Sequence, residues 1–185
     1  MIAPVQAPGA KTPVRKTQPA ASPPIKPVVA ASGRRIQVRR SGVHGKGVFA
    51  LQPIAKGEVV IEYTGELISW AQALQRHPHD PTDPNHTFYF HIDEAHVIDA
   101  KFGGNAARWI NHACQPNCVA DDDGRRVFIK ALRPIKPGQE LFYDYGLVID
   151  ERYTPALKKQ FACWCAATAC RGTMLAPKRA RLAAR

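Results

Sequence analysis

The sequence contains no apolar run of the length that a membrane-spanning helix needs, which is about 20 residues. Its first residues, M-I-A-P-V-Q-A-P-G-A-K, lack the apolar core of a signal peptide. We therefore expect an intracellular protein that does not follow the conventional secretory route.

Two common architectural signatures are also absent. The chain has no strand that leads through G-x-G-x-x-G into a helix, and it shows no internal repeat. The regular alternation of strands and helices that is typical of a doubly wound sheet is missing as well. What remains is a series of short strand-like stretches between Gly/Pro turns, which predicts a mostly β fold with several small sheets.

The strand-like stretches are brief, and most are rich in β-branched or aromatic residues. We expect strands within 34–40, 58–63, 87–92 and 96–99, and a hairpin over 119–131. Leu67, Ala71 and Leu74 recur at helical spacing, which predicts a helix over 67–76.

Acidic residues are missing from both ends of the chain. Residues 1–35 carry six Lys/Arg and residues 171–185 carry five, and together these account for the whole net charge of +11. Such ends suit binding to nucleic acid or acidic surfaces, and they equally suit simple solvation. Residues 1–33 also lack aromatic residues and are rich in Pro and Ala, so we expect a disordered basic tail there.

Cysteine is absent until residue 114, and the five cysteines that follow make an odd number. Three of them lie within eight residues as C-x-C-x4-C, a spacing too tight for an ordinary disulfide inside C-x-C but suited to chelation. Without a signal peptide, a metal site is favoured over a disulfide framework. The five are Cys114, Cys118, Cys163, Cys165 and Cys170.

The segment 103–118, G-G-N-A-A-R-W-I-N-H-A-C-Q-P-N-C, combines many polar groups with an apolar pair. Trp109 and Ile110 favour a dry interior, yet buried amides, guanidinium and imidazole groups must all be paired. Two interpretations stay open: a segment that binds a polar ligand, or a well-satisfied structural turn. The polar residues are Asn105, Arg108, Asn111, His112 and Asn117.

Four separated stretches resemble, in order and spacing, the SET-domain protein lysine methyltransferases. They are H-G-K-G-V-F-A (44–50), E-Y-T-G-E-L-I (62–68), R-W-I-N-H-A-C-Q-P-N-C (108–118) and G-Q-E-L-F-Y-D-Y-G (138–146). C-W-C-A-A-T-A-C-R-G (163–172) resembles the zinc-binding tail called post-SET. The V-I-D-A…G-N-A-A-R stretch looks closest to the mixed-lineage-leukaemia and trithorax branch.

The resemblance implies a SET fold, in which several small curved β-sheets surround a pseudoknot, followed by a small zinc-binding post-SET tail. It divides the chain into a SET domain over 34–147 and a post-SET zinc-binding segment over 148–172. A basic C-terminal tail follows over 173–185. Cofactor and peptide are expected on opposite faces, joined by a narrow channel.

The activity implied is methyl transfer from S-adenosyl-L-methionine to a lysine nitrogen. Tyr145 matches the catalytic tyrosine of the family, and Tyr143 matches the position that sets how many methyl groups are added. A tyrosine at 143 leaves little room for a methylated nitrogen, so mono- and dimethylation are expected. Tyr63 matches another tyrosine of the substrate channel. Phe88 falls where many relatives have tyrosine, and its neighbour Tyr89 is expected to pack elsewhere.

The resemblance also implies a cofactor site. Lys46 and Gly47 match the turn that approaches the methionine moiety, and Arg108 either contacts the cofactor or braces the knot. Trp164 either covers the adenine ring or is a surface aromatic. The full set implied for cofactor binding is Lys46, Gly47, Tyr63, Arg108, Asn111, His112, Tyr145 and Trp164.

A structural zinc ion is implied by the same resemblance. Cys163, Cys165 and Cys170 supply three thiolates, and Cys114 resembles the fourth ligand. Cys118 is then left over as a buried thiol.

The implied partner is a protein substrate with a lysine in a basic tail, most simply a histone, which places the protein in the cytoplasm or at chromatin. The Pro/Ala-rich tails also fit a bacterial relative that modifies its own DNA-binding protein or is exported to a host nucleus. Three other interpretations stay open. One is a catalytically weak SET-like module that binds peptide or nucleic acid through its basic tails, and another is a nucleic-acid binder that is also an enzyme. The third is a nucleophilic enzyme built on His112 and Cys114.

Overall fold

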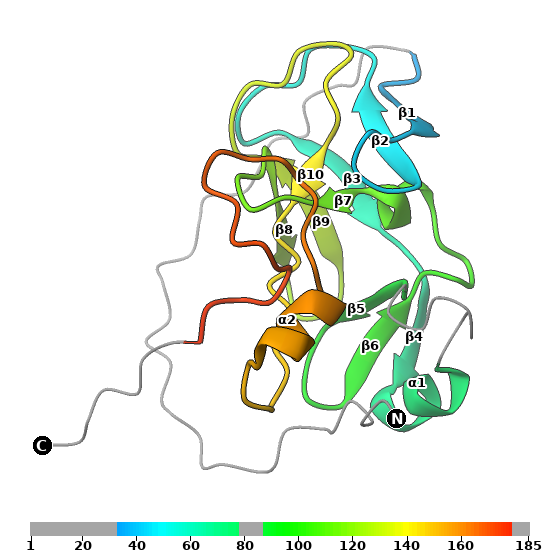
Figure 1. Ribbon diagram of the computed structural model, residues 1–185. Coiled ribbons are helices and arrows are strands. Elements are labelled where there is room, and N and C mark those ends of the chain that lie inside the picture. The colour runs from blue at the N-terminus through cyan, green and yellow to red at the C-terminus, as the bar shows by residue number, and fades with distance from the viewer. Residues whose placement is uncertain (1–32, 78–86, 179–185) are drawn as a thin grey trace, which may run out of the picture.

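A computed structural model of the protein describes residues 33–77 and 87–178 (Figure 1). The predicted disordered tail over 1–33 lies outside these ranges except for residue 33, and so do residues 179–185 of the basic C-terminal tail. No helix within them is long and apolar enough to cross a membrane.

The described residues form four small sheets, which confirms the expected mostly β fold. β1 (Ile36–Arg40) pairs antiparallel with β2 (Lys46–Ala50). A second sheet has the order β3 (Val59–Tyr63), β9 (Val127–Ala131), β8 (Cys118–Asp122). A third has the order β4 (Glu66–Ser69), β6 (His96–Asp99), β5 (Tyr89–His91). The fourth consists of β10 (Phe142–Tyr143) and β7 (Asn111–His112).

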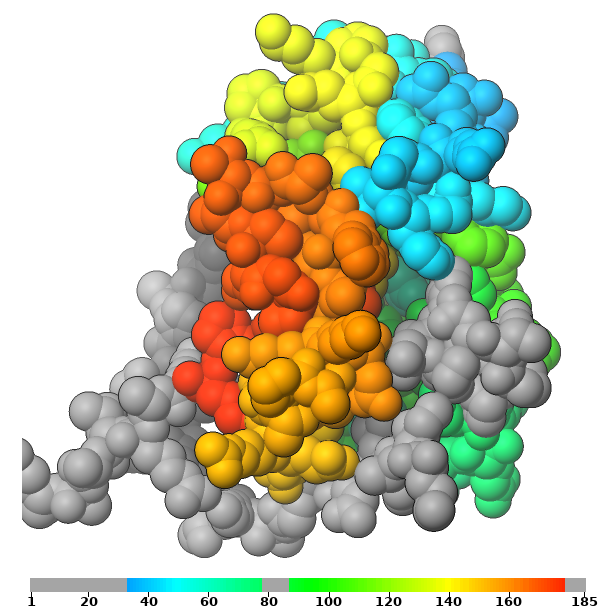
Figure 2. All heavy atoms as spheres, in the orientation of Figure 1, coloured from blue at the N-terminus to red at the C-terminus, as the bar shows by residue number. Residues whose placement is uncertain are grey.

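The described chain has three short helical elements, of which the first two connect strands. α1 (Trp70–Arg76) follows β4, a 3-10 turn η1 (Ala106–Trp109) precedes β7, and α2 (Pro155–Gln160) lies in the C-terminal segment. Figure 2 shows α2 and the residues after it as one layer over the front of the domain, beside the β1–β2 sheet.

One apolar core joins the first two sheets to the 103–118 segment, which we call the polar segment. In β9 the residues Val127, Ile129 and Ala131 are buried while those between them are only half-buried, as a period of two requires. Ile110 in the 103–118 segment and Leu141 in the 138–146 segment are also fully buried. Complete burial of such a side chain contributes about 1.5–3 kcal/mol, so this core holds the crossing segments in place.

The helix predicted over 67–76 is correct only from residue 70. Ser69 ends β4 and caps α1: its hydroxyl accepts from the Gln72 amide at 3.2 Å, and the Gln72 side chain accepts from the Ser69 amide at 2.9 Å. This reciprocal capping fixes the start of the helix.

The apolar face inferred for that helix was wrong. Leu67 and Leu74 are 54% and 41% exposed, whereas Ile68 and Ala73 are buried. The reason is nonlocal, because pairing of β4 with β6 gives residues 67 and 68 the period of a strand.

The 103–118 segment lies directly beside the 138–146 segment, as the expected pseudoknot requires. β7 runs parallel to β10, with Asn111 opposite Phe142 and His112 opposite Tyr143. The Asn117 side chain secures the crossing by donating to the Glu140 carbonyl at 2.8 Å and accepting from the Phe142 amide at 2.8 Å. The amide-rich sequence is thus explained by backbone groups that need partners away from a regular sheet.

The described chain remains packed beyond residue 172, where the basic tail was expected to start. Leu175 is 1% exposed and forms a bridge with Leu147, and Thr173 pairs with Ala162. An apolar residue within a basic stretch therefore extends the domain by a few residues.

We predict that Gly104→Ala destabilises the fold by about 1–3 kcal/mol, because an added Cβ would lie 2.7 Å from the Ala100 carbonyl carbon. Gly42→Ala is the matched control, since nothing lies within 4 Å of its added Cβ. Urea unfolding of both variants measures the difference. Equal stabilities would contradict the close packing at residue 104.

Candidate active site and thiol cluster

Three tyrosines from distant parts of the chain converge with a phenylalanine. The ring centroids of Tyr143 and Tyr145 are 4.9 Å apart, and Phe90 lies 5.2 Å from Tyr63 and 6.3 Å from Tyr143. Because β3, β5 and β10 belong to three different sheets, only the assembled fold creates this aromatic group.

Two of the three tyrosine hydroxyls donate to backbone carbonyls. Tyr145 Oη donates to the Ile110 oxygen at 2.9 Å, and Tyr63 Oη donates to the Phe88 oxygen at 3.0 Å. Burial raises the pKa of Tyr63, Tyr143 and Tyr145 well above the usual value near 10. All three therefore stay protonated at neutral pH, so they can donate and accept hydrogen bonds but do not act as bases.

Phe90 is an aromatic residue of this group that sequence reasoning missed. A strand places alternate side chains on one face, so Phe88 and Phe90 share a side while Tyr89 points away. Phe88 packs edge-on against Trp109 with centroids 5.0 Å apart. Tyr89 donates to the Ala73 carbonyl at 3.0 Å and packs with the second apolar cluster, as expected. The F-Y-F alternation was the available signal.

Asn111 is surrounded by hydrogen-bond acceptors. Its Nδ2 lies 2.9 Å from the Lys46 carbonyl, 3.2 Å from the His44 carbonyl and 3.0 Å from a Glu140 carboxylate oxygen. One amide nitrogen carries only two hydrogens, whereas each of these oxygens has two lone pairs. These acceptors around Asn111, which we call the Asn111 corner, can therefore accept from a further donor such as an ammonium group.

Gly47 makes that corner possible. A Cβ at this position would lie 2.7 Å from Cδ of Glu140, so any larger residue would displace the Glu140 side chain. The turn expected at Lys46 and Gly47 is part of strand β2 instead, and glycine is required there by close packing rather than by an unusual φ.

Lys46 and Arg108 both contact the Trp109 ring. Lys46 Nζ lies 4.5 Å and Arg108 Cζ 4.9 Å from its centroid, distances at which cations are attracted to an indole. Arg108 also donates to the Ala100 carbonyl at 3.0 Å, just after β6. Trp164 is 72% exposed and lies on the surface.

His112 connects the aromatic group to the cysteines. Its Nδ1 lies 3.1 Å from the Tyr145 amide, which donates to it, and its Nε2 lies 3.5 Å from Cys114 Sγ. Burial lowers the pKa of His112 against the opposing effect of Asp144. We therefore assign a neutral ring with its proton on Nε2, and the 3.4 Å approach of Asp144 to Nδ1 is not a charged pair.

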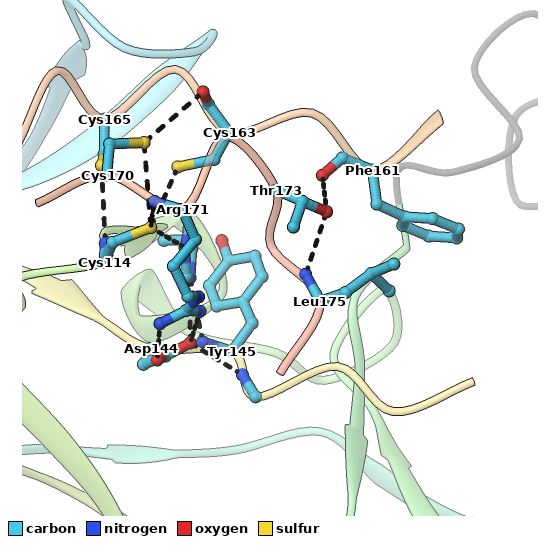
Figure 3. A network of polar contacts seen from close by, with 12 residues as sticks. Cys114, Asp144, Tyr145, Phe161, Cys163, Cys165, Cys170, Arg171, Thr173 and Leu175 are labelled. Atoms are coloured by element: carbon cyan, nitrogen blue, oxygen red, sulfur yellow. Dashed lines mark hydrogen bonds and ion pairs between the residues drawn. The ribbon is translucent and has the colours of Figure 1, made fainter. Parts of the chain in front are cut away.

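Cys114 meets the three C-terminal cysteines (Figure 3). All four sulfurs lie within 4.8 Å of one another, and Cys114 Sγ is 3.7 Å from Cys163 Sγ and 3.9 Å from Cys170 Sγ. Tetrahedral zinc with Zn–S bonds near 2.3 Å implies sulfur separations of about 3.8 Å. The four thiols therefore fit a closed metal site, and Cys118 is fully buried in the core instead.

Backbone amides surround the thiols. Amides donate from Cys114 to Cys165 Sγ at 3.5 Å, from Arg171 to Cys114 Sγ at 3.4 Å and from Gly172 to Cys170 Sγ at 3.4 Å. Burial opposes ionisation of Cys165, yet the hydrogen bonds lower its pKa to about 7. Such donors favour the thiolate form that binds metal. A nucleophilic Cys114–His112 pair is disfavoured, because Cys114 lies among three other thiols.

A family model described as SET domain matches residues 45–146. Histone-lysine N-methyltransferase SETD1 of Drosophila melanogaster is 34% identical over 146 residues, which cover 76% of this chain and 8% of that protein. Trithorax of the same organism is 39% identical over 140 residues, covering 74% and 4%. The histone-lysine N-methyltransferase, H3 lysine-4 specific, of Kluyveromyces lactis is 41% identical over 138 residues, covering 72% and 13%.

A solved structure is also similar. A chain in the crystal structure of the Chaetomium thermophilum polycomb repressive complex 2 is 33% identical with a TM-score of 0.57, and the match covers 63% of this chain and 16% of that one. The present chain thus spans only a small part of each relative. The expected likeness to trithorax is confirmed.

We predict that Cys114→Ser lowers the zinc content of the purified protein, because it replaces one of four thiolates with a weaker ligand. The control is Cys118→Ala, which removes the thiol outside the cluster and should retain the metal. Elemental analysis of both variants provides the measurement. Full zinc content in the Cys114 variant would show that this residue is not a ligand.

Proposed function

The chain belongs to the SET-domain family, and from that premise we propose that it is a protein-lysine N-methyltransferase that uses S-adenosylmethionine. The observation that supports this proposal is that the aromatic group adjoins the acceptors around Asn111. The Tyr145 hydroxyl donates to the carbonyl of Ile110, and the next residue, Asn111, contacts those acceptors. A channel for an amine and a site for a methionine-like group would thus adjoin each other.

The residues around Asn111 fit the cofactor. The Lys46 carbonyl, the Glu140 carboxylate and the Asn111 side chain would bind its ammonium group, while the His112 backbone and the exposed Trp164 would contact the adenine. When bound, S-adenosylmethionine supplies a sulfonium methyl group that is open to in-line attack. Little acid–base chemistry is required, so the protein contributes mainly orientation.

The aromatic group is proposed to receive the target lysine. A lysine attacks only as the neutral amine, although its pKa in water is about 10.4. Burial among Tyr63, Phe90 and Tyr143 would disfavour the ammonium form and lower that pKa. The protonated hydroxyls of Tyr143 and Tyr145 would then orient the nitrogen through hydrogen bonds.

The thiol cluster is proposed to hold a structural zinc ion. Cys114, on the polar segment, and the three cysteines of 163–170 would bind one ion together. Zinc would thereby fix the 148–172 segment against the SET domain and complete the site only when metal is present.

The proposed substrate is a lysine in a histone tail, which implies a protein that acts at chromatin. The support is that the similar proteins are named histone-lysine N-methyltransferases, one of them specific for lysine 4 of histone H3. A histone H3 tail is therefore the first substrate to test.

We predict that Tyr145→Phe slows methyl transfer to histone H3 by about a hundredfold, because the hydroxyl that orients the amine is lost. Binding of S-adenosylhomocysteine should be retained. Tyr153→Phe is the control, since Tyr153 Oη contacts only the Ile149 amide at 3.4 Å among the hydrogen bonds of the described chain. Incorporation of labelled methyl groups measures the rates.

Two outcomes of this assay would decide against the proposal. Equal rates in Tyr145→Phe and wild type would remove Tyr145 from the site. A wild type that binds the histone tail and S-adenosylhomocysteine without transferring methyl groups would establish the binding-module alternative.

The product is proposed to be mono- or dimethyllysine. Tyr143 is 9% exposed, and its ring lies between Phe90 and Tyr145, so its hydroxyl occupies space that a third methyl group would need. We predict that Tyr143→Phe shifts the products toward trimethyllysine, as measured by mass spectrometry. Tyr89→Phe is the control, because Tyr89 lies on the face of β5 that points away from Phe90 and the aromatic group. Efficient trimethylation by the wild type would refute the assignment.

A further inference from the structure

Asp144 lies between Tyr143 and Tyr145 in the sequence, and Arg171 of the C-terminal segment binds its carboxylate. Arg171 Nη1 lies 2.7 Å from Asp144 Oδ2, and Nη2 lies 2.8 Å from Oδ1 (Figure 3). The Gly146 amide also donates to Asp144 Oδ1 at 3.0 Å. Two parallel charge-assisted bonds fix both partners in orientation as well as distance.

Arg171 is at the same time part of the surroundings of the thiol cluster. It directly follows Cys170, and its backbone amide donates to Cys114 Sγ at 3.4 Å. The guanidinium and the amide of one residue therefore reach the tyrosine segment and a proposed metal ligand.

A second connection closes a ring of contacts. Cys114 Sγ lies 3.5 Å from His112 Nε2, and His112 Nδ1 accepts from the Tyr145 amide. Tyr145 adjoins Asp144, which returns to Arg171. The backbone of Tyr145 is thus tied to Cys114 from both sides, through His112 and through the Asp144–Arg171 pair.

We infer that Arg171 is a positioning residue that couples the thiol cluster to Tyr143 and Tyr145 through Asp144. This inference rests on the proposed function, because Tyr145 must act on the substrate for its position to matter. Outside the two-residue strand β10, the 144–146 segment has no sheet partner among the described elements. Without the guanidinium, this segment would keep the His112 contact and the neighbouring Leu147–Leu175 bridge, but it would lose the charged bonds that hold Asp144 to the residue beside the thiol cluster.

The side-chain environment supports a positioning role. The side chains of Arg171 and Asp144 are 24% and 35% exposed, so the pair lies at the edge of the site. It contacts no residue of the Asn111 corner in the hydrogen bonds of the described chain. Cofactor affinity and metal content should therefore survive removal of the guanidinium while the tyrosine geometry changes.

The test compares Arg171→Ala, Asp144→Ala and the double variant with wild type. We expect Arg171→Ala to lower kcat on histone H3 by about ten- to a hundredfold, as expected for misplacement of a catalytic group by about 1 Å. Zinc content and the Kd of S-adenosylhomocysteine should stay close to wild type. If Arg171 acts through Asp144, the double variant should be no slower than the slower single variant.

Hydrogen exchange gives a readout that does not depend on turnover. In Arg171→Ala, the amides of 144–147 should exchange faster, while those of β1 and β2 should be unchanged. Arg35→Ala is the matched control, because Arg35 makes a similarly half-buried pair with Glu58 at 2.6 Å, and those side chains are 21% and 16% exposed. The control should retain both kcat and protection of 144–147.

Each possible result has a defined meaning. Unchanged exchange and kcat in Arg171→Ala would overturn the inference, and so would loss of zinc, because Arg171 would then belong to the metal site itself. Arg171→Lys serves if the alanine variant does not fold. Since lysine cannot form two parallel bonds, full wild-type kcat and protection in that variant would also refute the role. A wild type without methyl transfer would refute the proposed function, while the exchange data would still test the coupling.

Discussion

The parallel pairing of β7 with β10 is the contact on which the rest of this structure depends. Two residues of each strand are enough to align Asn111 with Phe142 and His112 with Tyr143. So short a sheet is stable only because other groups hold its ends: the Asn117 side chain bonds to both neighbours of Leu141, and Ile110 and Leu141 are buried below it. Removing these supports would separate the tyrosine segment from the acceptors around Asn111.

The crossing also explains why so polar a segment lies inside a small β protein. Strands of two residues leave most nearby backbone groups without a ladder partner, and buried groups of this kind must be satisfied. The Asn117 side chain supplies such partners beside β10, while Asn105 and Asn111 bond to the carbonyls of Glu62 on β3 and Lys46 on β2. The Ile110 carbonyl, just before β7, is left to accept from the Tyr145 hydroxyl.

The C-terminal layer is held to the domain mainly by thiol and charge contacts rather than by apolar packing. α2 has no buried residue, so apolar packing contributes little there apart from Leu175. What joins this layer to the domain is the thiol cluster, the Arg171–Asp144 pair and the bridge from Leu147 to Leu175. A segment held mainly by thiols and charge would be sensitive to loss of the proposed zinc ion in a way that the core sheets are not.

The amino-acid sequence by itself determined some local elements and the reactive groups they carry: the alternation in 127–131, the C-x-C-x4-C thiols and the run of amides. Its family motifs also predicted that Cys114 would lie beside the other cysteines and that Tyr145 would lie near the Asn111 segment. Only the tertiary structure decided that Leu67 lies in a strand, that Phe90 joins the aromatic group and that Arg171 reaches Asp144. The reason is physical, because periodicity reports which face of an element is buried, whereas partners distant in the sequence are selected by the way the segments cross.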